Sequence, residues 1–481
     1  MKRFKTLPQV LWWGLVAAVV GTSAQAVEPA ANPAPQAPSQ VAVFKPLVDK
    51  VAPVTSFELT QLAHHFDLSH DAQILSVMEH AQVDPAERFY VSDRRSAESV
   101  LSSITTIEQM HLGEVGVALL NQDGIMMLYS SERFPLMSIM KFHVAYAVLS
   151  RMVERGERLR STISVKLSDL DPDTYSPMYD ELERRNFRVN TCEPGGHISP
   201  AINALLSAYG QACQEGTAES ESYHRWGDLY LQHLNQGPHI IPAGASIPAL
   251  GHHPNKIKIC LGDLIYYAVR ESDNNACDIL INYYLGGIDK LEKFWHDKGV
   301  TGLKFKYTEA QMAQDPARCY ENSATPYALA QSYAVYLNDT KLPIQLHRFL
   351  DDTMLFAPTG ADRIQRGINR TLSELAVSNE QEQELFKSLR IFDKTGTGGL
   401  NEAGKRIAVN DMAYINYEGK PYILVVLVKN ISGTAKSSAQ DGELALRKAS
   451  RVAFTYGLNR FHHAEVVTPI DLVRSCSSRG N

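Results

Sequence analysis

The sequence predicts an α+β fold in which strands from both ends of the chain form one antiparallel sheet and a helical cluster is inserted between them. A hairpin pattern occupies residues 115–130, and a second one occupies residues 407–430, each with apolar strands around a short polar turn. The segments between these two hairpins have mostly helical spacing of their apolar residues. This order differs from the regular strand and helix alternation of a parallel sheet.

Helices are expected on both sides of the hairpins. Residues 96–113 have the spacing of an amphipathic helix and end in the stop signal Gly113. A helix follows the first hairpin and runs to about Val153, and a closing helix is expected over residues 441–461. Residues 44–95 also have helical spacing but contain no recognisable chemistry, and we interpret them as an extension for packing or docking.

The composition excludes some classes of function. With 481 residues, 44% hydrophobic and 21% charged, the chain has an ordinary soluble globular composition. A net charge of -6 and a pI near 6.3 provide no basic surface for a polyanion, so no nucleic acid partner is expected. The histidines and cysteines lack the spacing of metal ligands, so no metal site is expected.

The N-terminus has the features of an export signal. Residues 1–26 combine a basic start, an apolar segment and small residues before the expected cleavage point, and a Pro/Ala-rich linker follows over residues 27–43. A retained anchor is the alternative, but the apolar run is shorter than the roughly 20 residues that a membrane span needs. We therefore expect a soluble exported protein, periplasmic, with no stable membrane anchor.

Export to an oxidising compartment permits disulfides. Cys192 and Cys213 lie close together in a Gly/Pro/Ser-rich region and are the candidates for a bridge. Cys260, Cys277 and Cys319 lie in apolar or helical contexts, where buried free thiols are expected.

One lysine interrupts the apolar stretch "RFPLMSIMKFHVAYAVL". If Ser138 opens a buried helix, its hydroxyl lies at the positive end of the helix dipole, and Lys141 lies on the same face. A serine needs a group that takes its proton, and desolvation can lower the pKa of a lysine enough to help. The alternative is that Lys141 only extends its ammonium to solvent from a half-buried helix.

Two further motifs follow in order. Ser272, Asp273 and Asn274 form "SDN" between two helical segments, and "KTGT" begins at Lys394 at the end of a strand pattern. Alone, each has an ordinary structural interpretation, as a helix N-cap and as a turn. Their joint occurrence after the "SIMK" motif makes coincidence a poor explanation.

Together with "TYSPM" (residues 174–178), "SDNNACDIL" and "LGG", these motifs resemble the serine β-lactamases of class A, and most closely their second subclass. The resemblance covers residues 96–461 and implies one domain over residues 96–463, with the serine β-lactamase and penicillin-binding protein fold and a tail over residues 464–481. It implies β-lactam antibiotics as substrates and neither a metal nor an organic cofactor.

The resemblance also implies residue roles. Ser138 would attack the lactam carbonyl, Lys141 would activate it, and Ser272 would relay a proton to the leaving nitrogen. The backbone N–H groups of Ser138 and Thr397 would form the oxyanion hole. Tyr175 would line the cleft entrance and Asn274 would contact the substrate amide. The remaining substrate-binding positions are in the KTGT motif: Lys394, Thr395, Gly396 and Thr397, with the three side chains holding the substrate carboxylate.

Glu309, in "KYTEAQMAQDP", occupies the place of the family's deacylating glutamate, which separates a hydrolase from a transpeptidase. The alternative is a surface glutamate on a polar loop. Many family members have an asparagine four residues later, where this chain has Ala313, so the water site is expected to be remodelled.

A second departure is the distance of 134 residues (272 − 138) between Ser138 and Ser272, about twice the family's usual separation. The excess lies over residues 180–255 and leaves open a lid, a surface for an unknown protein partner, or a neutral addition. Two other functions also stay open: a D,D-peptidase acting on peptidoglycan, and a non-catalytic sensor or scaffold that is acylated once.

Overall fold

The computed structural model describes residues 65–80, 89–93, 95–184, 256–376 and 378–461. The expected signal, linker and C-terminal tail, nearly all of the insertion, and both Cys192 and Cys213 lie outside these ranges. The sequence-based expectations for those segments therefore stay predictions.

The main sheet is antiparallel throughout and has the order β1-β3-β2-β11-β10-β9. The two predicted hairpins lie side by side at its centre, where β2 pairs with β11. This confirms the predicted α+β fold with a sheet from both chain ends. The strands are β1 (Phe89–Val91), β2 (Glu114–Asn121), β3 (Gly124–Tyr129), β9 (Leu389–Thr397), β10 (Arg406–Tyr417) and β11 (Lys420–Ile431).

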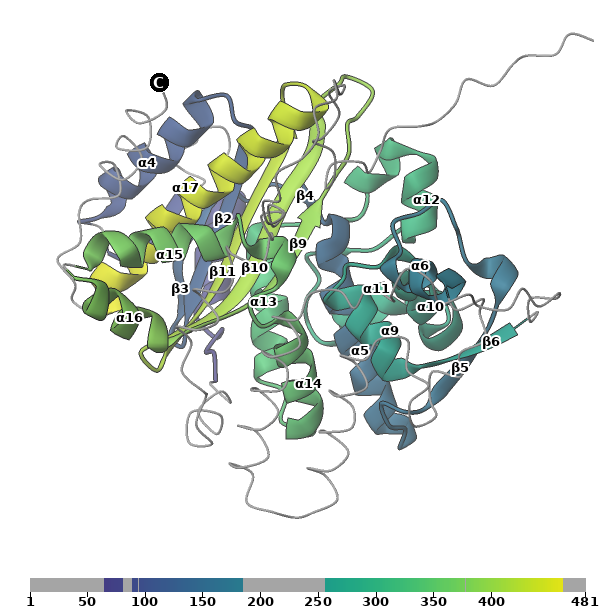
Figure 1. The fold of residues 1–481 in the computed structure, drawn as a ribbon. Coiled ribbons are helices and arrows are strands. Elements are labelled where there is room, and N and C mark those ends of the chain that lie inside the picture. The colour runs from purple at the N-terminus through teal and green to yellow at the C-terminus, as the bar shows by residue number, and fades with distance from the viewer. Residues whose placement is uncertain (1–64, 81–88, 94, 185–255, 377, 462–481) are drawn as a thin grey trace, which may run out of the picture.

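Both faces of this sheet are covered by helices, which explains why almost every residue of β10 and β11 is buried. One face packs against the long C-terminal helix and its neighbours, and the other packs against α13 and the helical cluster (Figure 1). The sheet helices are α4 (Ala97–Gln109), α13 (Pro326–Leu337), α15 (Ile364–Leu375), α16 (Asn379–Lys387) and α17 (Ala435–Phe461).

The helical cluster surrounds α5 (Met140–Arg155), and most of the α5 side chains are buried. Its other helices are α6 (Pro177–Arg184), α9 (Leu261–Val269), α10 (Asn274–Ile279), α11 (Ile288–Asp297), α12 (Glu309–Gln314) and α14 (Ile344–Met354). The connections contain the 3₁₀ turns η3 (Met137–Ile139), η4 (Leu167–Asp169), η6 (Pro316–Tyr320) and η7 (Pro358–Gly360) and the π-helical turn η5 (Leu280–Leu285). They also contain the short strands β4 (Phe134–Pro135), β5 (Thr162–Lys166), β6 (Lys256–Cys260), β7 (Leu303–Lys304) and β8 (Ser323–Ala324).

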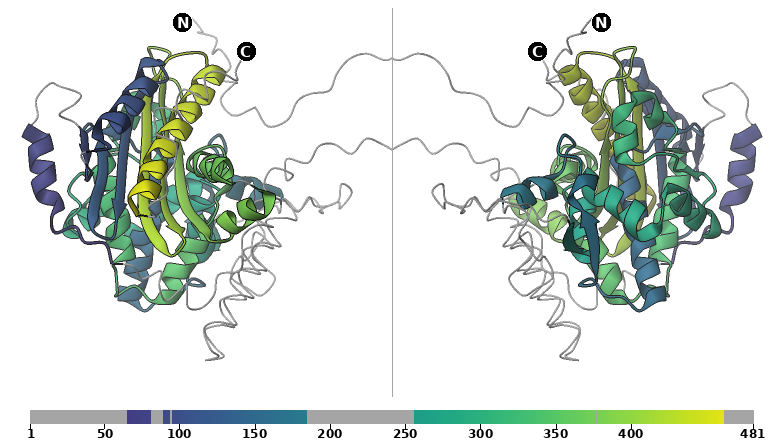
Figure 2. Two further views of the ribbon diagram at one scale, coloured as in Figure 1. Left: turned by 90° about the vertical axis from the view of Figure 1, so that its left-hand side faces the viewer. Right: turned by 90° about the vertical axis from the view of Figure 1, so that its right-hand side faces the viewer.

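The described part of the N-terminal extension is only partly helical. The helix α3 (Asp71–His80) agrees with the helical interpretation and lies at the edge of the molecule (Figure 2). Phe89–Val91 instead forms the edge strand β1, because an aromatic and β-branched triplet pairs with the open side of β3. The helical interpretation of residues 44–95 is therefore wrong at this point.

Buried polar contacts fasten the extension to the domain. Asn338 holds the backbone of the buried residue Phe66 at both its N–H and its C=O, at 2.8 and 2.9 Å. The carboxylate of Asp71 accepts hydrogen bonds from the Ile125 N–H at 3.1 Å and from the Tyr327 hydroxyl at 2.9 Å. Since Asp71 is buried, this clasp makes residues 66–71 part of the folded domain.

Cys260 is disulfide-bonded, so the expectation of a free thiol is wrong at this position. Its partner lies outside the described residues, because Cys277 and Cys319 are free and buried, as expected. Apolar context alone could not separate these cases, since a bonded and a free cysteine are equally apolar. In the described ranges, no helix combines the length and the apolar character needed to cross a bilayer.

Candidate active site

Ser138 lies in the 3₁₀ turn η3, directly before the buried helix α5. Its predecessor Met137 adopts φ 50°, a left-handed conformation that costs energy for a residue with a side chain. Ser138 itself is only half buried, whereas Lys141, one turn on, is fully buried. The hydroxyl is therefore open to a substrate and the ammonium is shielded from water.

The Lys141 ammonium is the centre of the site. It donates to Ser138 Oγ at 3.0 Å, to the backbone oxygen of Ser272 at 2.6 Å and to Asn274 Oδ1 at 2.6 Å. Its Nζ also lies 3.2 Å from Glu309 Oε1. Four oxygens thus surround three N–H protons, so a buried charge is compensated and a short proton route joins Ser138 to Glu309.

Ser272 faces a second buried lysine. It adopts φ 57° in the loop between α9 and α10, and its Oγ accepts a hydrogen bond from Lys394 Nζ at 3.1 Å. Burial, followed by the neighbouring positive charge of Lys141, lowers the pKa of Lys394 to about 7. The KTGT motif lies at the end of a strand, as predicted, and this strand, β9, is an edge strand of the sheet.

Asp273 organises the loop around the motif. It is the N-cap of α10, accepting from the Ala276 N–H at 2.8 Å, and it also accepts from the Met178 N–H at 2.7 Å and from the Ser176 hydroxyl. Burial raises the pKa of Asp273 to about 6. The SDN motif therefore both caps α10 and belongs to the site.

Asn274 connects the ammonium to the segment that contains Tyr175. Its side-chain nitrogen donates to Thr174 Oγ1 at 2.9 Å, and its backbone N–H donates to the Tyr175 carbonyl at 3.1 Å. Burial, together with the negative charge of Glu271, raises the pKa of Tyr175 to about 12. The structure thus brings Tyr175 to the same site as the three motifs.

Gly396 explains why strand β9 can approach the nucleophile. A Cβ atom at this position would lie 2.7 Å from the Leu136 carbonyl oxygen and 3.1 Å from Met137 Cβ. Only a glycine allows the strand to press against the η3 turn. The same close approach packs the end of β9 against the turn that contains Ser138.

Arg363 is a residue of the site that the sequence did not reveal. This buried guanidinium donates to Thr397 Oγ1 at 2.5 Å, to the Gly396 carbonyl at 3.2 Å and to the Asn410 carbonyl at 2.8 Å. It adds a fixed positive charge beside the KTGT motif. Its surroundings, "TGADRIQ", contain no pattern that could have identified it.

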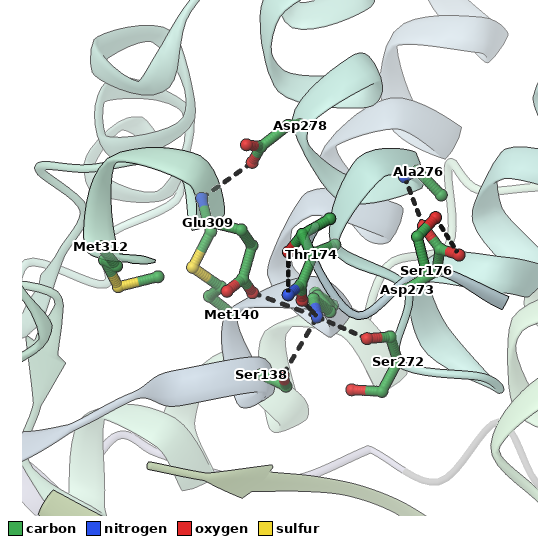
Figure 3. A network of polar contacts seen from close by, with 12 residues as sticks. Ser138, Met140, Thr174, Ser176, Ser272, Asp273, Ala276, Asp278, Glu309 and Met312 are labelled. Carbon is green, nitrogen blue, oxygen red and sulfur yellow. Dashed lines mark hydrogen bonds and ion pairs between the residues drawn. The ribbon is translucent and has the colours of Figure 1, made fainter. Parts of the chain in front are cut away.

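Glu309 is the first residue of α12 and is held by a neighbouring carboxylate. Asp278 accepts the backbone N–H of Glu309 at 2.8 Å (Figure 3). It also accepts that of Ala310 at 2.9 Å. Burial and the negative charge of Glu309 raise the pKa of Asp278 to about 7. A capping box of Thr308 and Gln311 fixes the same helix start. The sequence analysis missed Asp278, although it lies in the quoted motif "SDNNACDIL".

Asn322 closes the neck of the loop that contains Glu309. Its Oδ1 accepts the N–H groups of Lys306 and Tyr307 at 2.7 and 2.9 Å, and its Nδ2 donates to the Tyr307 carbonyl at 2.7 Å. Asn322 is fully buried, whereas Ala313, four residues after Glu309 on α12, is exposed. The backbone of Glu309 is therefore fixed at the start of α12, and Ala313 offers no amide four residues later.

These side chains define a class of site: a half-exposed serine with a buried amine, a second serine and a carboxylate, as in serine-dependent acyl transfer. All ten predicted site residues lie together, including Thr395, whose hydroxyl is 2.8 Å from that of Thr359. In the part of the chain that the structure describes, no group of three or more potential ligands could hold a metal ion.

Comparisons with known proteins agree with this class. A model described as the Beta-lactamase enzyme family matches residues 241–456. The chain is 24% identical to a β-lactamase of Bacteroides uniformis, over 68% of this chain and 81% of that protein. It is 22% identical to the β-lactamase VEB-1 of Pseudomonas aeruginosa, over 77% and 94%.

Solved structures support the fold. A class A β-lactamase from Bacteroides cellulosilyticus superposes with a TM-score of 0.51 at 23% identity, over 75% of this chain and 97% of that one. The TLA-1 extended spectrum β-lactamase gives 0.50 at 21%, over 74% and 99%. These structures show the fold of the class A β-lactamases, in agreement with the resemblance, and the β-lactamase relatives support a β-lactam-hydrolysing enzyme.

Proposed function

We propose that this chain is an exported serine β-lactamase that hydrolyses the β-lactam amide through an acyl-enzyme on Ser138. The observation that carries the proposal is the position of the Lys141 ammonium, 3.0 Å from Ser138 Oγ and 3.2 Å from Glu309 Oε1. One amine thereby contacts both the nucleophile of the first half-reaction and the base of the second.

Acylation begins when Ser138 Oγ attacks the lactam carbonyl and loses its proton toward Lys141 or, through it, toward Glu309. The developing oxyanion is stabilised by the backbone N–H groups of Ser138 and Thr397. Collapse of the tetrahedral intermediate breaks the C–N bond. Ser272 relays to the leaving nitrogen the proton that Ser138 lost, so Lys141 and Glu309 return to their starting protonation states before deacylation; Lys394 supports the Ser272 hydroxyl at 3.1 Å.

Substrate orientation rests on the cationic end of the cleft. Lys394, Thr395 and Thr397 hold the substrate carboxylate, and Arg363 keeps the Thr397 hydroxyl in place and adds a positive charge. At the opposite side Asn274 contacts the substrate amide while its own oxygen stays bonded to Lys141. Fixing the lactam from both sides brings its carbonyl within reach of Ser138.

Deacylation requires a water that Glu309 activates for attack on the ester of Ser138. The buried ion pair with Lys141 keeps the Glu309 carboxylate beside the nucleophile. Attack forms a second tetrahedral intermediate, and its collapse releases the product acid and returns the proton to Ser138 Oγ.

The test uses the purified chain from residue 27 onward with a chromogenic cephalosporin, followed by absorbance and intact mass. We expect many turnovers from the native protein and none from Ser138→Ala. Glu309→Gln should accumulate a covalent adduct, because deacylation slows more than acylation; equal slowing of both steps would refute the role of Glu309.

The missing amide at Ala313 makes a slow second half-reaction the specific alternative. A single adduct on native Ser138 that persists without turnover would favour a D,D-peptidase or a non-catalytic sensor. Release of a terminal D-alanine from a peptidoglycan pentapeptide would then separate the peptidase from the sensor.

A further inference from the structure

A chain of hydrogen bonds, called the Tyr320 tether below, connects the loop that contains Glu309 (residues 306–322) to the end of the sheet. The hydroxyl of Tyr320, the last residue of η6, accepts from Asn401 Nδ2 at 2.9 Å and donates to Asn430 Oδ1 at 3.0 Å. Asn430 in turn donates to the Glu114 carboxylate at 2.7 Å. A single phenol thus connects the loop, the turn between β9 and β10, and the ends of β11 and β2.

Asn401 organises the turn that follows strand β9. Its Oδ1 accepts the Lys405 N–H at 3.0 Å, its backbone N–H donates to the Lys405 carbonyl at 2.8 Å, and its carbonyl accepts from Gly404 at 2.9 Å. Asn401 lies only four residues after Thr397, the end of β9. Holding Asn401 therefore restrains the strand end that faces the nucleophile.

The other end of the tether is coupled to α12. The Arg318 side chain of η6 donates to the Gln311 carbonyl of α12 at 3.1 Å, and Cys319 is buried beneath the loop. Since α12 begins at Glu309, a shift of Tyr320 would be transmitted to the base. Both walls of the cleft on this side are thereby connected through one hydroxyl.

This side of the cleft is where the substituent next to the lactam carbonyl must lie. In a β-lactam the carboxylate and the acyl substituent lie on opposite sides of the reacting C–N bond. Because Lys394, Thr395 and Arg363 occupy the carboxylate side, we place the acyl group toward Glu309, between α12 and the end of β9. The separation of these two elements then limits how large that group can be.

We propose that Tyr320 is a specificity-determining positioning residue, whose hydroxyl fixes the opening between the Glu309 helix and the end of β9. The proposal rests on the proposed β-lactamase function. A tight tether favours β-lactams with small acyl substituents, and its loss admits large ones.

The test compares Tyr320→Phe with the native protein on two cephalosporins that share a ring system and differ only in the size of the acyl substituent. We expect the ratio of kcat/KM for the large substrate to that for the small one to rise about fivefold, the factor of one neutral hydrogen bond. Asn401→Ala, which removes the other partner, should change this ratio in the same direction.

Tyr307→Phe is the matched control, because the Tyr307 hydroxyl contacts Glu321 at 3.3 Å on the same loop and does not reach the sheet. Its ratio should equal that of the native protein. Equal loss of kcat/KM for both substrates in Tyr320→Phe would show a purely structural role and overturn the proposal.

Hydrogen exchange separates failure of this proposal from failure of the proposed function. The amides of residues 401–405 should exchange faster in Tyr320→Phe than in the native protein or in Tyr307→Phe. Unchanged exchange overturns the tether whether or not the protein turns over β-lactams, whereas absent turnover with faster exchange refutes only the β-lactamase function and the specificity built on it.

Discussion

Lys394 makes the proposed reaction sensitive to alkaline pH. Burial and the positive charges of Lys141 and Arg363 lower its pKa to about 7, against smaller opposite effects of Glu309 and Asp393. The charged fraction then falls from about one half at pH 7 to about one in a hundred at pH 9. Because the charged form holds the substrate carboxylate, we expect kcat/KM to fall about 50-fold over these two pH units.

The perturbation that tests this is Lys394→Arg. A guanidinium keeps its proton over the whole range, so the alkaline decrease due to this residue should disappear even if the variant is slower at every pH. The assay is the initial rate at substrate concentrations well below KM, from pH 6 to pH 10, for both proteins. The same alkaline slope in both would refute the assignment, since another group would then control it.

The pH dependence of stability gives an independent check on the direction of the Lys394 pKa shift. Between pH 7 and the ordinary lysine pKa of 10.5, the folded state binds fewer protons at Lys394 than the unfolded state does. The contribution of this lysine to the free energy of unfolding therefore rises with pH in that window. If activity falls at pH 9 while the free energy of unfolding does not, the loss of activity is due to deprotonation of Lys394 and not to unfolding.

Three further predictions concern other buried groups. Asn322→Ala leaves three backbone groups at Lys306 and Tyr307 without partners, so it should lower the free energy of unfolding by about 2–4 kcal/mol in urea titrations. Ala313→Asn places an amide on the face of α12 that contains Glu309, so it should speed adduct decay followed by mass. Asp71→Ala should cost about 1–3 kcal/mol in the same titrations but leave kcat unchanged, because its partners belong to β3 and α13.

Each of these predictions has an outcome that contradicts it. Native-like stability of Asn322→Ala would mean that the loop neck closes without the buried amide. An unchanged or slower adduct decay in Ala313→Asn would show that the deacylating water is held elsewhere. A lower kcat in Asp71→Ala would connect the clasp to the site, against its position at the far side of the sheet from β9.

The sequence was sufficient for the parts of the site that depend on local pattern. The hairpins could be predicted because apolar strand runs and turn residues are local, and the three motifs then placed Ser138, Ser272 and Lys394 on the elements where the structure has them. One sheet from both hairpins was also predicted, and the structure shows that β2 and β11 are the strands that join them.

The parts that could not be predicted depend on backbone groups far away in sequence. Arg363 acts on the carbonyls of β9 and β10, and Asn322 acts on the N–H groups of a loop neck formed 15 or 16 residues earlier. The β1 strand exists only because β3 offers an open edge, and the bond at Cys260 depends on which thiol the fold brings near it. None of these conditions leaves a local pattern in the sequence.

The position of Glu309 illustrates how far geometry and sequence jointly constrain the release step. Asp278 fixes its backbone at the helix start, the buried Asn322 closes the loop neck that precedes it, and the Lys141 ammonium holds its carboxylate. Because these contacts already fix the orientation of the Glu309 carboxylate, it loses little entropy when it orients a water. The missing amide at Ala313 therefore affects the binding of that water more than the orientation of the carboxylate. The proposed enzyme should therefore differ from relatives with that amide in its deacylation rate and much less in its acylation rate.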